Sequence, residues 1–235
     1  MTSKRFPPRI SVIIPALNEQ DAIQRVIADI PDGLVTEIVV VDNGSTDQTA
    51  RFASDMGARI VYQKRRGYGW ACLAGIAALN RPDIVVFLDG DYSDHPDEMP
   101  VVMDPVLRGN ADFVVGSRAL GTRDRGALLP QARFGNWLAT RLIRLLFNIT
   151  YSDLGPFRAI RYPALIQMNM QDKTFGWTVE MQVKAAKMRL RIEEIPVSYR
   201  RRIGVSKVTG TLNGTIRAGW KILFTIFKYR FTNAL

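Results

Sequence analysis

Residues 84–91 read IVVFLDGD, a five-residue apolar run followed by two aspartates around a glycine. A short apolar run rich in β-branched residues predicts a strand buried on both faces, as in a parallel sheet. Asp89 and Asp91 then lie where this strand ends, and Gly90 lets the backbone come close to a ligand. Carboxylates so placed are typical of a Mg²⁺ site, although an acidic turn has the same composition.

The chain before residue 84 alternates strand-like and helix-like segments. Repeated β-α-β units predict an α/β domain with a mostly parallel sheet and helices on both faces. A further strand is expected at residues 113–115. The strand-like runs cover 10–14, 37–41 and 59–62, and the helix-like segments cover 23–30, 45–57 and 69–79.

Polar segments follow the predicted strands, at the sheet edge where ligands bind. They read PALNE at 15–19 and DNGSTD at 42–47, besides the acidic pair. The Asp42 carboxylate can accept a hydrogen bond from a ribose or a base, while Ser45 and Gln48 predict a capping box for the next helix. Gly67 follows three basic residues and precedes another helix, a pattern that fits an anion site. Together these segments favour a ligand site over a simple acidic turn.

The second half is less regular. Helices are expected at 134–147, 178–188 and 214–229, and a strand at 192–199 that Pro196 interrupts. In the first of these helices one face carries Arg133, Trp137, Arg141 and Arg144, and another carries Leu138, Leu142 and Leu145. The last helix places Trp220, Leu223, Phe224 and Phe227 opposite Arg217, Lys221 and Lys228. That pattern fits an amphipathic helix at a membrane interface, and equally a helix packed on the core of its own domain.

Composition indicates one folded domain of 235 residues, because 47% hydrophobic and 23% charged residues are ordinary for a globular protein. The single cysteine, Cys72, excludes an internal disulfide and fits a reducing compartment. No signal peptide and no membrane-spanning run is visible. We therefore expect a cytoplasmic protein, or one peripheral on the inner face of the cell membrane.

The net charge of +10 favours polyanionic partners, such as diphosphates, nucleic acid or anionic lipid. Basic residues concentrate in 118–144 and 184–207, whereas carboxylates concentrate in 83–104. The acidic segments at the strand ends would repel a nucleic-acid backbone, and no helix-turn-helix or zinc motif is present. Nucleic acid is therefore not expected as a partner.

Three motifs in order, SVIIPALNE (11–19), VDNGSTD (41–47) and LDGD (88–91), resemble the family 2 inverting glycosyltransferases of the GT-A fold. Three further motifs, GSR (116–118), GPFR (155–158) and GVSK (204–207), are similar to the dolichyl-phosphate or polyprenyl-phosphate sugar synthase branch. The resemblance runs from about residue 10 to 207. It implies a donor-binding part at about 8–120, an acceptor-binding part at about 121–210 and a C-terminal helix at about 211–235.

The resemblance also implies roles for individual residues. Asp89 and Asp91 would coordinate Mg²⁺ or Mn²⁺ on the diphosphate of a UDP- or GDP-linked hexose, with Asp91 also counted as catalytic. Ser93 stands where the branch has a glutamine ligand, so water or Asp94 would take that place. The nucleotide sugar would be bound by Pro15, Asn18, Glu19, Asp42, Gly67 and Gly90. The diphosphate and an acceptor phosphate would be neutralised by Arg118, Arg133, Arg201 or Arg202, Ser206 and Lys207, with Arg118 and Lys207 at the reacting centre.

The acceptor stays open at this level. A polyprenyl phosphate is already ionised at pH 7 and needs no strong base, whereas a hydroxyl acceptor must lose a proton. Glu180 and Asp153 are the candidate bases, and each equally fits a structural role, Glu180 as a surface charge on a helix and Asp153 as a turn former. The first hypothesis is transfer to polyprenyl phosphate at an anionic membrane surface. The second is transfer to the hydroxyl of a glycolipid, a polysaccharide or a small acceptor.

Overall fold

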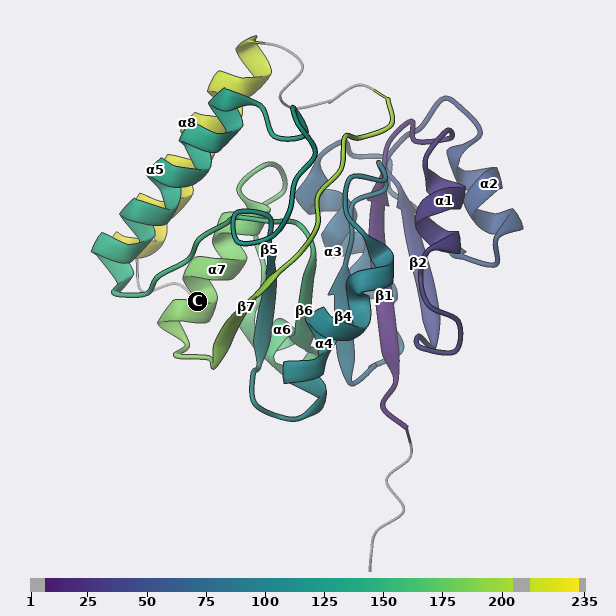
Figure 1. The fold of residues 1–235 in the computed structure, drawn as a ribbon, viewed down its shortest axis with the longest axis horizontal. Helices are drawn as coiled ribbons and strands as arrows, with labels where there is room; N and C mark the ends of the chain where they lie inside the picture. Colours follow the sequence, from purple (N-terminus) through teal and green to yellow (C-terminus); the bar gives the residue numbers. More distant parts are fainter. Residues whose placement is uncertain (1–6, 205–211, 233–235) are drawn as a thin grey trace, which may run out of the picture.

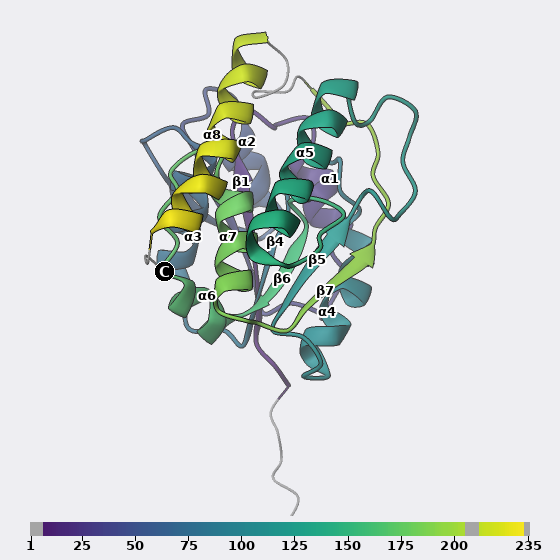
Figure 2. The same cartoon turned by 90° about the vertical axis from the view of Figure 1, so that its left-hand side faces the viewer.

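The computed structural model describes residues 7–204 and 212–232, which form a three-layer α/β domain (Figures 1 and 2). Its centre is a seven-stranded sheet in the order β3-β2-β1-β4-β6-β5-β7. All strand pairs are parallel except those of β6, which runs antiparallel to β4 and β5. The predicted α/β fold with a mostly parallel sheet is confirmed.

The strands are short, and their register brings the predicted ligand segments to one edge. Ala16 at the end of β1 pairs with Asp42 at the end of β2, and Ile13 in β1 pairs with Phe87 at the end of β4. The chain order reverses between β1 and β4, which is where ligands bind in open α/β sheets. The strands are β1 Ile10–Ala16, β2 Glu37–Asp42, β3 Arg59–Tyr62, β4 Ile84–Phe87, β5 Phe113–Ser117, β6 Arg158–Arg161 and β7 Ile192–Pro196.

The helices are divided between the two faces of the sheet. One face, built on alternate strand residues such as Ile13 and Phe87, packs against α3 (Tyr68–Ala78), α5 (Pro130–Phe147), α6 (Tyr162–Met168), α7 (Trp177–Lys187) and α8 (Leu212–Phe231). The other face, built on residues such as Val12 and Val86, packs against α1 (Ile23–Ala28), α2 (Thr49–Asp55) and α4 (Met99–Leu107). A three-residue 3₁₀ turn, η1 (Pro96–Glu98), leads into α4. Burial of both faces explains why these strands read as continuous apolar runs.

Some elements differ from the sequence predictions. The capping box is wrong: Asp47 accepts the Thr49 amide hydrogen at 3.0 Å, whereas the Ser45 hydroxyl oxygen accepts the backbone N–H of Asn18. In α5 the predicted leucine face is divided: Leu145 is exposed, whereas Leu142 packs against the core beside the buried Ile143. The elements β6, α4 and α6 were not predicted.

Helices α5 and α8 lie side by side, and both pack on α7 (Figure 2). The core side of α8 consists of Ala218, Thr225, Ile226 and Tyr229, so the predicted aromatic face is not the face that packs on the domain. Trp220, Phe224, Phe227 and Phe231 are exposed instead. Among residues 7–204 and 212–232, no helix combines the length and apolar character needed to cross a bilayer.

Candidate active site

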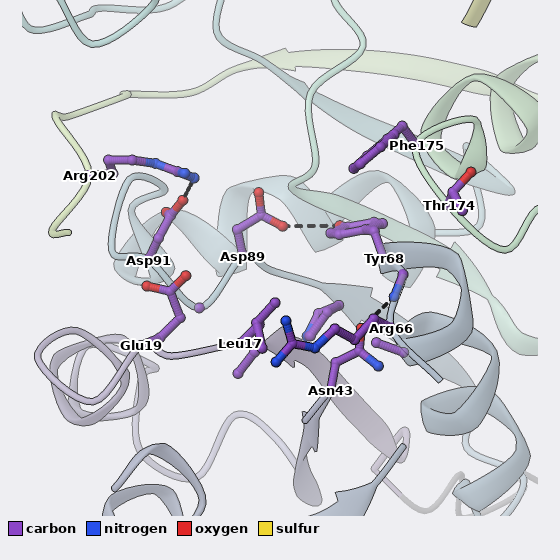
Figure 3. Close-up of a pocket in the computed structure, with 15 residues that line it drawn as sticks. Leu17, Glu19, Asn43, Arg66, Tyr68, Asp89, Asp91, Thr174, Phe175 and Arg202 are labelled. Atoms are coloured by element: carbon purple, nitrogen blue, oxygen red, sulfur yellow. Dashed lines mark hydrogen bonds and ion pairs between the residues drawn. The ribbon is translucent and has the colours of Figure 1, made fainter. Parts of the chain in front are cut away.

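A pocket of about 340 Å³ opens at the carboxyl ends of β1, β2 and β4 (Figure 3). Its lining includes six of the residues predicted to bind the nucleotide sugar, namely Pro15, Glu19, Gly67, Asp89, Gly90 and Asp91. Arg202 enters from the segment after β7, while Thr174 and Phe175 come from the segment before α7. Residues distant in sequence are thus brought together at the predicted sheet edge.

Asp89 lines this pocket and is partly buried. The Tyr68 hydroxyl donates a hydrogen bond of 3.0 Å to its Oδ1 (Figure 3). Burial raises the pKa of the Asp89 carboxyl, although the charge of Arg202 and the hydrogen bond from Tyr68 act in the opposite direction. A carboxylate desolvated in this way gains most from a cation beside it.

Asp91 is held from two sides. Its Oδ1 accepts hydrogen bonds from the backbone N–H and the hydroxyl of Ser93, at 2.9 and 2.5 Å. Its Oδ2 forms an ion pair with the Arg202 guanidinium (Figure 3). Ser93 is fully buried, so in this geometry it orients Asp91. The Asp91 side chain is consequently aimed into the pocket toward a positive charge.

Asp94 follows in the same turn. Its Oδ2 accepts the Asp89 backbone N–H at 3.4 Å, and its buried Oδ1 has no hydrogen-bond partner among the described residues. Burial, together with the charge of Asp89, raises the pKa of the Asp94 carboxyl to about 7. Asp94 therefore adds a further buried acceptor beside the pair that lines the pocket.

This donor set fits a divalent ion held jointly with a diphosphate. Mg²⁺ and Mn²⁺ take oxygen ligands, and in phosphate-transfer sites the protein gives one or two carboxylates while the substrate completes the shell. Within the described ranges no cluster of three or more His, Cys, Asp or Glu side chains could hold a metal alone. The ion pair between the Arg202 guanidinium and the Asp91 carboxylate shows that this carboxylate accommodates a positive charge.

The wall formed by the β2 end is fixed by Asn43. Its amide nitrogen donates to the carbonyls of Gln63 and Arg65, and its Oδ1 accepts the Gly67 N–H at 2.7 Å. Asn18 and Asp42 lie beside the pocket lining rather than in it: Asp42 accepts the Ser45 N–H, and Asn18 accepts the Thr46 N–H. Both side chains thereby order the segment after β2.

At Gly67 and Gly69 the backbone at the start of α3 packs closely against the segment before α7. A Cβ on Gly69 would lie 2.1 Å from the Asp172 carbonyl oxygen, and one on Gly67 would lie 2.3 Å from that of Lys173. The Trp70 backbone N–H at the start of α3 donates to the same Lys173 carbonyl at 3.0 Å. This amide, at the helix start for which an anion site was predicted, therefore already holds the segment before α7.

Arg118 and Asp153 form a buried pair. The guanidinium and the backbone N–H of Arg118 donate to Asp153 at 2.7 to 2.9 Å, and the guanidinium lies 4.9 Å from the centre of the Tyr199 ring. Burial opposes the charge on both groups, but the ion pair raises the pKa of Arg118 and lowers that of Asp153. A low pKa and hydrogen-bonded oxygens leave Asp153 poorly suited to accept a proton from a substrate.

A second cavity of about 340 Å³ opens between the segment after β5 and the start of α5. It is lined by Ala119, Arg123, Leu128, Arg133, Asn136, Trp137, Thr140 and Ser152. The exposed guanidinium groups of Arg123 and Arg133 have no ion-pair partner within the described part of the chain. Because the Ser152 hydroxyl lies 2.6 Å from that of Ser117, next to Arg118, this cavity borders the buried pair.

The remaining predicted residues lie elsewhere. Glu180 is fully buried, accepts the Tyr229 hydroxyl hydrogen at 2.5 Å and pairs with Lys184 at 3.0 Å, so its predicted position on a helix surface is wrong and its role as base has no geometric support. Arg201 donates to the Arg125 carbonyl instead of lining the pocket. Ser206 and Lys207 lie outside the described residues.

Several pocket residues had no assigned role in the sequence-based hypothesis. Asn43 and Tyr68 stand inside motifs already recognised, next to Asp42 and Gly67, and could have been found from that position. Thr174 and Phe175 carry no local signal, because only the packing of their segment on α3 brings them to the pocket.

Comparisons with known proteins agree with this geometry. Residues 11–168 match the model of glycosyl transferase family 2. A Mycobacterium tuberculosis protein named an uncharacterized glycosyltransferase is 36% identical over 91% of this chain and 97% of its own. A dolichyl-phosphate hexose transferase of Haloferax volcanii is 34% identical over 85% of this chain and 86% of its own. An undecaprenyl-phosphate mannosyltransferase of Micrococcus luteus is 27% identical over 88% and 90%.

Among solved structures, glucosyl-3-phosphoglycerate synthase of Mycobacterium tuberculosis is similar in fold. Its complex with Mn²⁺, uridine-diphosphate-glucose and phosphoglyceric acid gives a TM-score of 0.76 at 26% identity, covering 95% of this chain and 80% of that one. The α/β architecture is therefore that of the GT-A glycosyltransferases, as the motifs led us to expect. With two thirds of its length matching the family model and relatives above 30% identity, this chain belongs to glycosyltransferase family 2.

Proposed function

We propose that this glycosyltransferase moves a hexose from a UDP- or GDP-linked donor to a polyprenyl phosphate, with inversion at the anomeric carbon. The observation that carries the proposal is a pair of cavities linked through Arg118. The carboxylates of Asp89 and Asp91 line a pocket at the sheet edge, an arginine-lined cavity borders the Arg118–Asp153 pair, and the charge of Arg118 acts on Asp89. The first suits a metal-bound diphosphate and the second suits a phosphate.

On the donor side, Asp89 and Asp91 would hold Mg²⁺ or Mn²⁺. The bound ion would neutralise the negative charge that grows on the diphosphate as the sugar departs. Arg202, which lines the pocket, would exchange its contact with Asp91 for one with a diphosphate oxygen. A guanidinium suits this role because it donates two parallel hydrogen bonds to a phosphate.

The nucleoside would occupy the part of the pocket lined by Pro15, Leu17, Asn43 and Arg66. Of these, Asn43 is fixed by three hydrogen bonds, so its wall needs little reorganisation when a base or ribose binds. Pre-organised walls lower the entropic cost of binding.

On the acceptor side, Arg123 and Arg133 line the second cavity with guanidinium groups that have no ion-pair partner among residues 7–204 and 212–232. Arg118 lies deeper, where its charge also acts on Asp89 and Asp94. An acceptor phosphate drawn to these groups would approach the donor from the α5 side. Fixed positive charges would hold it there without the reorganisation that water requires.

The proposed reaction needs no general base. An oxygen of the ionised acceptor phosphate attacks the anomeric carbon, the bond from that carbon to the β-phosphate oxygen breaks, and the electron pair leaves with the nucleoside diphosphate. The environments of Asp153 and Glu180 are consistent with this, because both carboxylates already accept hydrogen bonds inside the protein.

A lipid acceptor would also explain the surface formed by α5 and α8. Phe134 and Trp137 on α5 are more than half exposed, and so is Trp220 on α8. Exposed Arg141, Arg144 and Arg217 accompany them. Aromatic and basic side chains together suit the boundary between anionic headgroups and acyl chains. We therefore propose that these helices rest on the membrane, as a peripheral protein of cell-envelope synthesis would.

A second candidate function is transfer to the hydroxyl of a small acceptor that carries a phosphate. The structural similarity to glucosyl-3-phosphoglycerate synthase favours it, because that enzyme has been crystallised with phosphoglyceric acid. The arginine-lined cavity would then hold the phosphate of a soluble molecule. This candidate requires a proton acceptor, for which Asp153 and Glu180 were predicted.

The test is a donor and acceptor screen with purified protein and Mn²⁺ or Mg²⁺. UDP- and GDP-hexoses are each offered with undecaprenyl phosphate in vesicles, with phosphoglyceric acid, or alone, and the released nucleoside diphosphate is measured. Release that depends on the lipid phosphate is expected. Release with phosphoglyceric acid alone would favour the second candidate, and no release with any pair would refute the proposal.

Arg133→Gln gives a matched test of the acceptor site. It should raise the KM for the lipid phosphate about tenfold while leaving the KM for the donor unchanged, because Arg133 lines only the second cavity. Arg108→Gln, an exposed change beside Asp104 on α4, is the control.

A further inference from the structure

The segment between α6 and α7 forms one wall of the donor pocket. Thr174 and Phe175 line that pocket on the side opposite Asp91 (Figure 3). The segment has no helix or strand of its own, so its shape depends on what binds its backbone amides. Two buried carboxylates do so, and both are tied to α8.

The first carboxylate is Glu180. Its two oxygens accept the backbone N–H groups of Gln171 and Asp172, at 2.8 and 2.6 Å. The Tyr229 hydroxyl, on the core side of α8, donates to Glu180 Oε1 at 2.5 Å. Tyr229 thus orients the side chain that fixes the start of the segment.

The second carboxylate is Asp172. Its Oδ1 accepts the backbone N–H groups of Thr174 and Gly176, at 2.8 and 3.2 Å, which closes the segment into a turn. Its Oδ2 forms an ion pair of 2.8 Å with Lys221 of α8. Asp172 is almost completely buried, so Lys221 compensates a charge that solvent does not reach well.

The geometry also leaves no space between α8 and this turn. A Cβ on Gly176 would lie 2.5 Å from the hydroxyl oxygen of Thr225. On its other side the segment is held by α3, through the hydrogen bond from the Trp70 N–H to the Lys173 carbonyl. The wall of the pocket is therefore clamped between α3 and α8.

We infer that Lys221 and Tyr229 of α8 are positioning residues for the donor site. They hold segment 171–176 in the shape that presents Thr174 and Phe175 to the sugar nucleotide. This inference rests on the proposed function, because it takes the pocket at Asp89 and Asp91 as the donor site. It makes α8 a part of the donor-binding machinery, in addition to its proposed contact with lipid.

The test compares Lys221→Gln and Tyr229→Phe with Arg230→Gln. Arg230 is exposed on the same helix, so its substitution removes the same charge as Lys221→Gln without touching the segment. The two positioning variants should raise the KM for the nucleotide sugar about fivefold or more with kcat within twofold of wild type. Arg230→Gln should match wild type, and Lys221→Arg should restore most of the donor KM.

Hydrogen exchange in the ligand-free protein gives a second readout. The amides of residues 171–176 should exchange at least tenfold faster in Lys221→Gln and Tyr229→Phe, while the amides of β1 keep their protection. Unchanged exchange in this segment, or exchange that rises equally throughout the molecule, would overturn the inference. If wild-type protein turns over no nucleotide sugar, the proposed function fails, but the exchange experiment still decides whether α8 holds the segment.

Discussion

Asp89 is a partly buried carboxylate whose neighbours act on its charge in opposite directions. Burial raises the pKa of its carboxyl, while the charge of Arg202 and the Tyr68 hydroxyl favour its ionised form. A carboxylate whose ionised form is favoured by such neighbours can bind a cation, and the hydrogen bond from Tyr68 fixes the orientation of the carboxylate. Tyr68 is itself partly buried beside it, and desolvation raises the pKa of the phenol well above its usual value, so it stays a donor.

Tyr68→Phe removes this single hydrogen bond and keeps the ring. We expect the affinity for UDP or GDP in Mn²⁺ to fall by roughly three- to tenfold, the equivalent of about 1 kcal/mol. Titration calorimetry measures it. Tyr92→Phe is the control, because the Tyr92 hydroxyl donates to Asp29, away from the pocket lining. Equal losses in both variants would show that Tyr68 has no specific role.

The helices and strands differ in how clearly the local sequence predicts them. Strands β1, β2 and β4 are buried on both faces, and their apolar runs led directly to the acidic sheet edge. Strand β6 reads RAIR, and its terminal arginines break the apolar pattern that predicts a buried strand. It nevertheless runs antiparallel between β4 and β5. Helix α4 contains Pro105, which argues against a helix on local grounds. Contacts distant in sequence decide these elements, as they decide the position of Thr174 and Phe175.

At the start of α3, residues 172–173 pack so closely against Gly69 that a side chain would not fit there. Gly69→Ala should destabilise the fold by about 2 kcal/mol or more, because the new methyl group would collide with the Asp172 backbone carbonyl. Gly135→Ala in α5 meets no atom within 4 Å and should stabilise by about 0.5 to 1 kcal/mol. Urea unfolding of the two variants measures both effects. A stable Gly69→Ala protein would show that α3 and this segment are not tightly packed.

At the opposite edge of the sheet, Asp112 joins three strands. Its carboxylate accepts hydrogen bonds from Arg191 before β7 and from Arg161 at the end of β6, which hold its pKa well below the usual range. The folded state therefore binds this proton less readily than the unfolded state. The stability that Asp112 contributes is complete above about pH 4 and declines as the pH falls toward its lowered pKa.

Asp112→Asn should consequently cost about 1 kcal/mol at pH 7, a figure reduced for the exposure of both arginines. The difference from wild type should shrink when unfolding is measured near pH 3. Asp104→Asn, which loses only an exposed pair with Arg108, should show no pH-dependent difference. A constant difference from pH 7 to pH 3 would contradict the ionic origin of the effect.

At the scale of the whole molecule, the excess of basic residues and the exposed aromatic residues coincide. The chain has a net charge of +10, and α5 and α8 lie next to each other with Phe134, Trp137, Trp220 and Phe224 exposed. The amphipathic pattern of α8 was visible in the sequence, but the sequence left open which face would pack. In the structure, Ile226 and Tyr229 of α8 pack in the core, whereas the aromatic face is exposed.

The joint variant Trp220→Ser/Phe224→Ser should therefore bind anionic vesicles about a hundredfold more weakly, since each aromatic side chain contributes about 1.5 kcal/mol or more when buried in lipid. Sedimentation with vesicles measures this, and added salt should weaken the binding of wild type. Tyr62→Ser, at an equally exposed aromatic position on β3, should bind as wild type does. Equal binding by all three proteins would contradict a membrane contact through α8.

The most direct measurement is the affinity of UDP and GDP for wild type, Asp89→Asn and Asp91→Asn, each titrated with Mn²⁺ and with EDTA. Asp55→Asn, on the surface of α2, is the control. If Asp89 and Asp91 hold the metal, Mn²⁺ should strengthen wild-type and control binding at least tenfold for the correct nucleotide, and this gain should disappear in both pocket variants. Wild-type affinity that is the same in EDTA, or pocket variants that keep the full gain from Mn²⁺, would show that these carboxylates do not bind a metal–diphosphate.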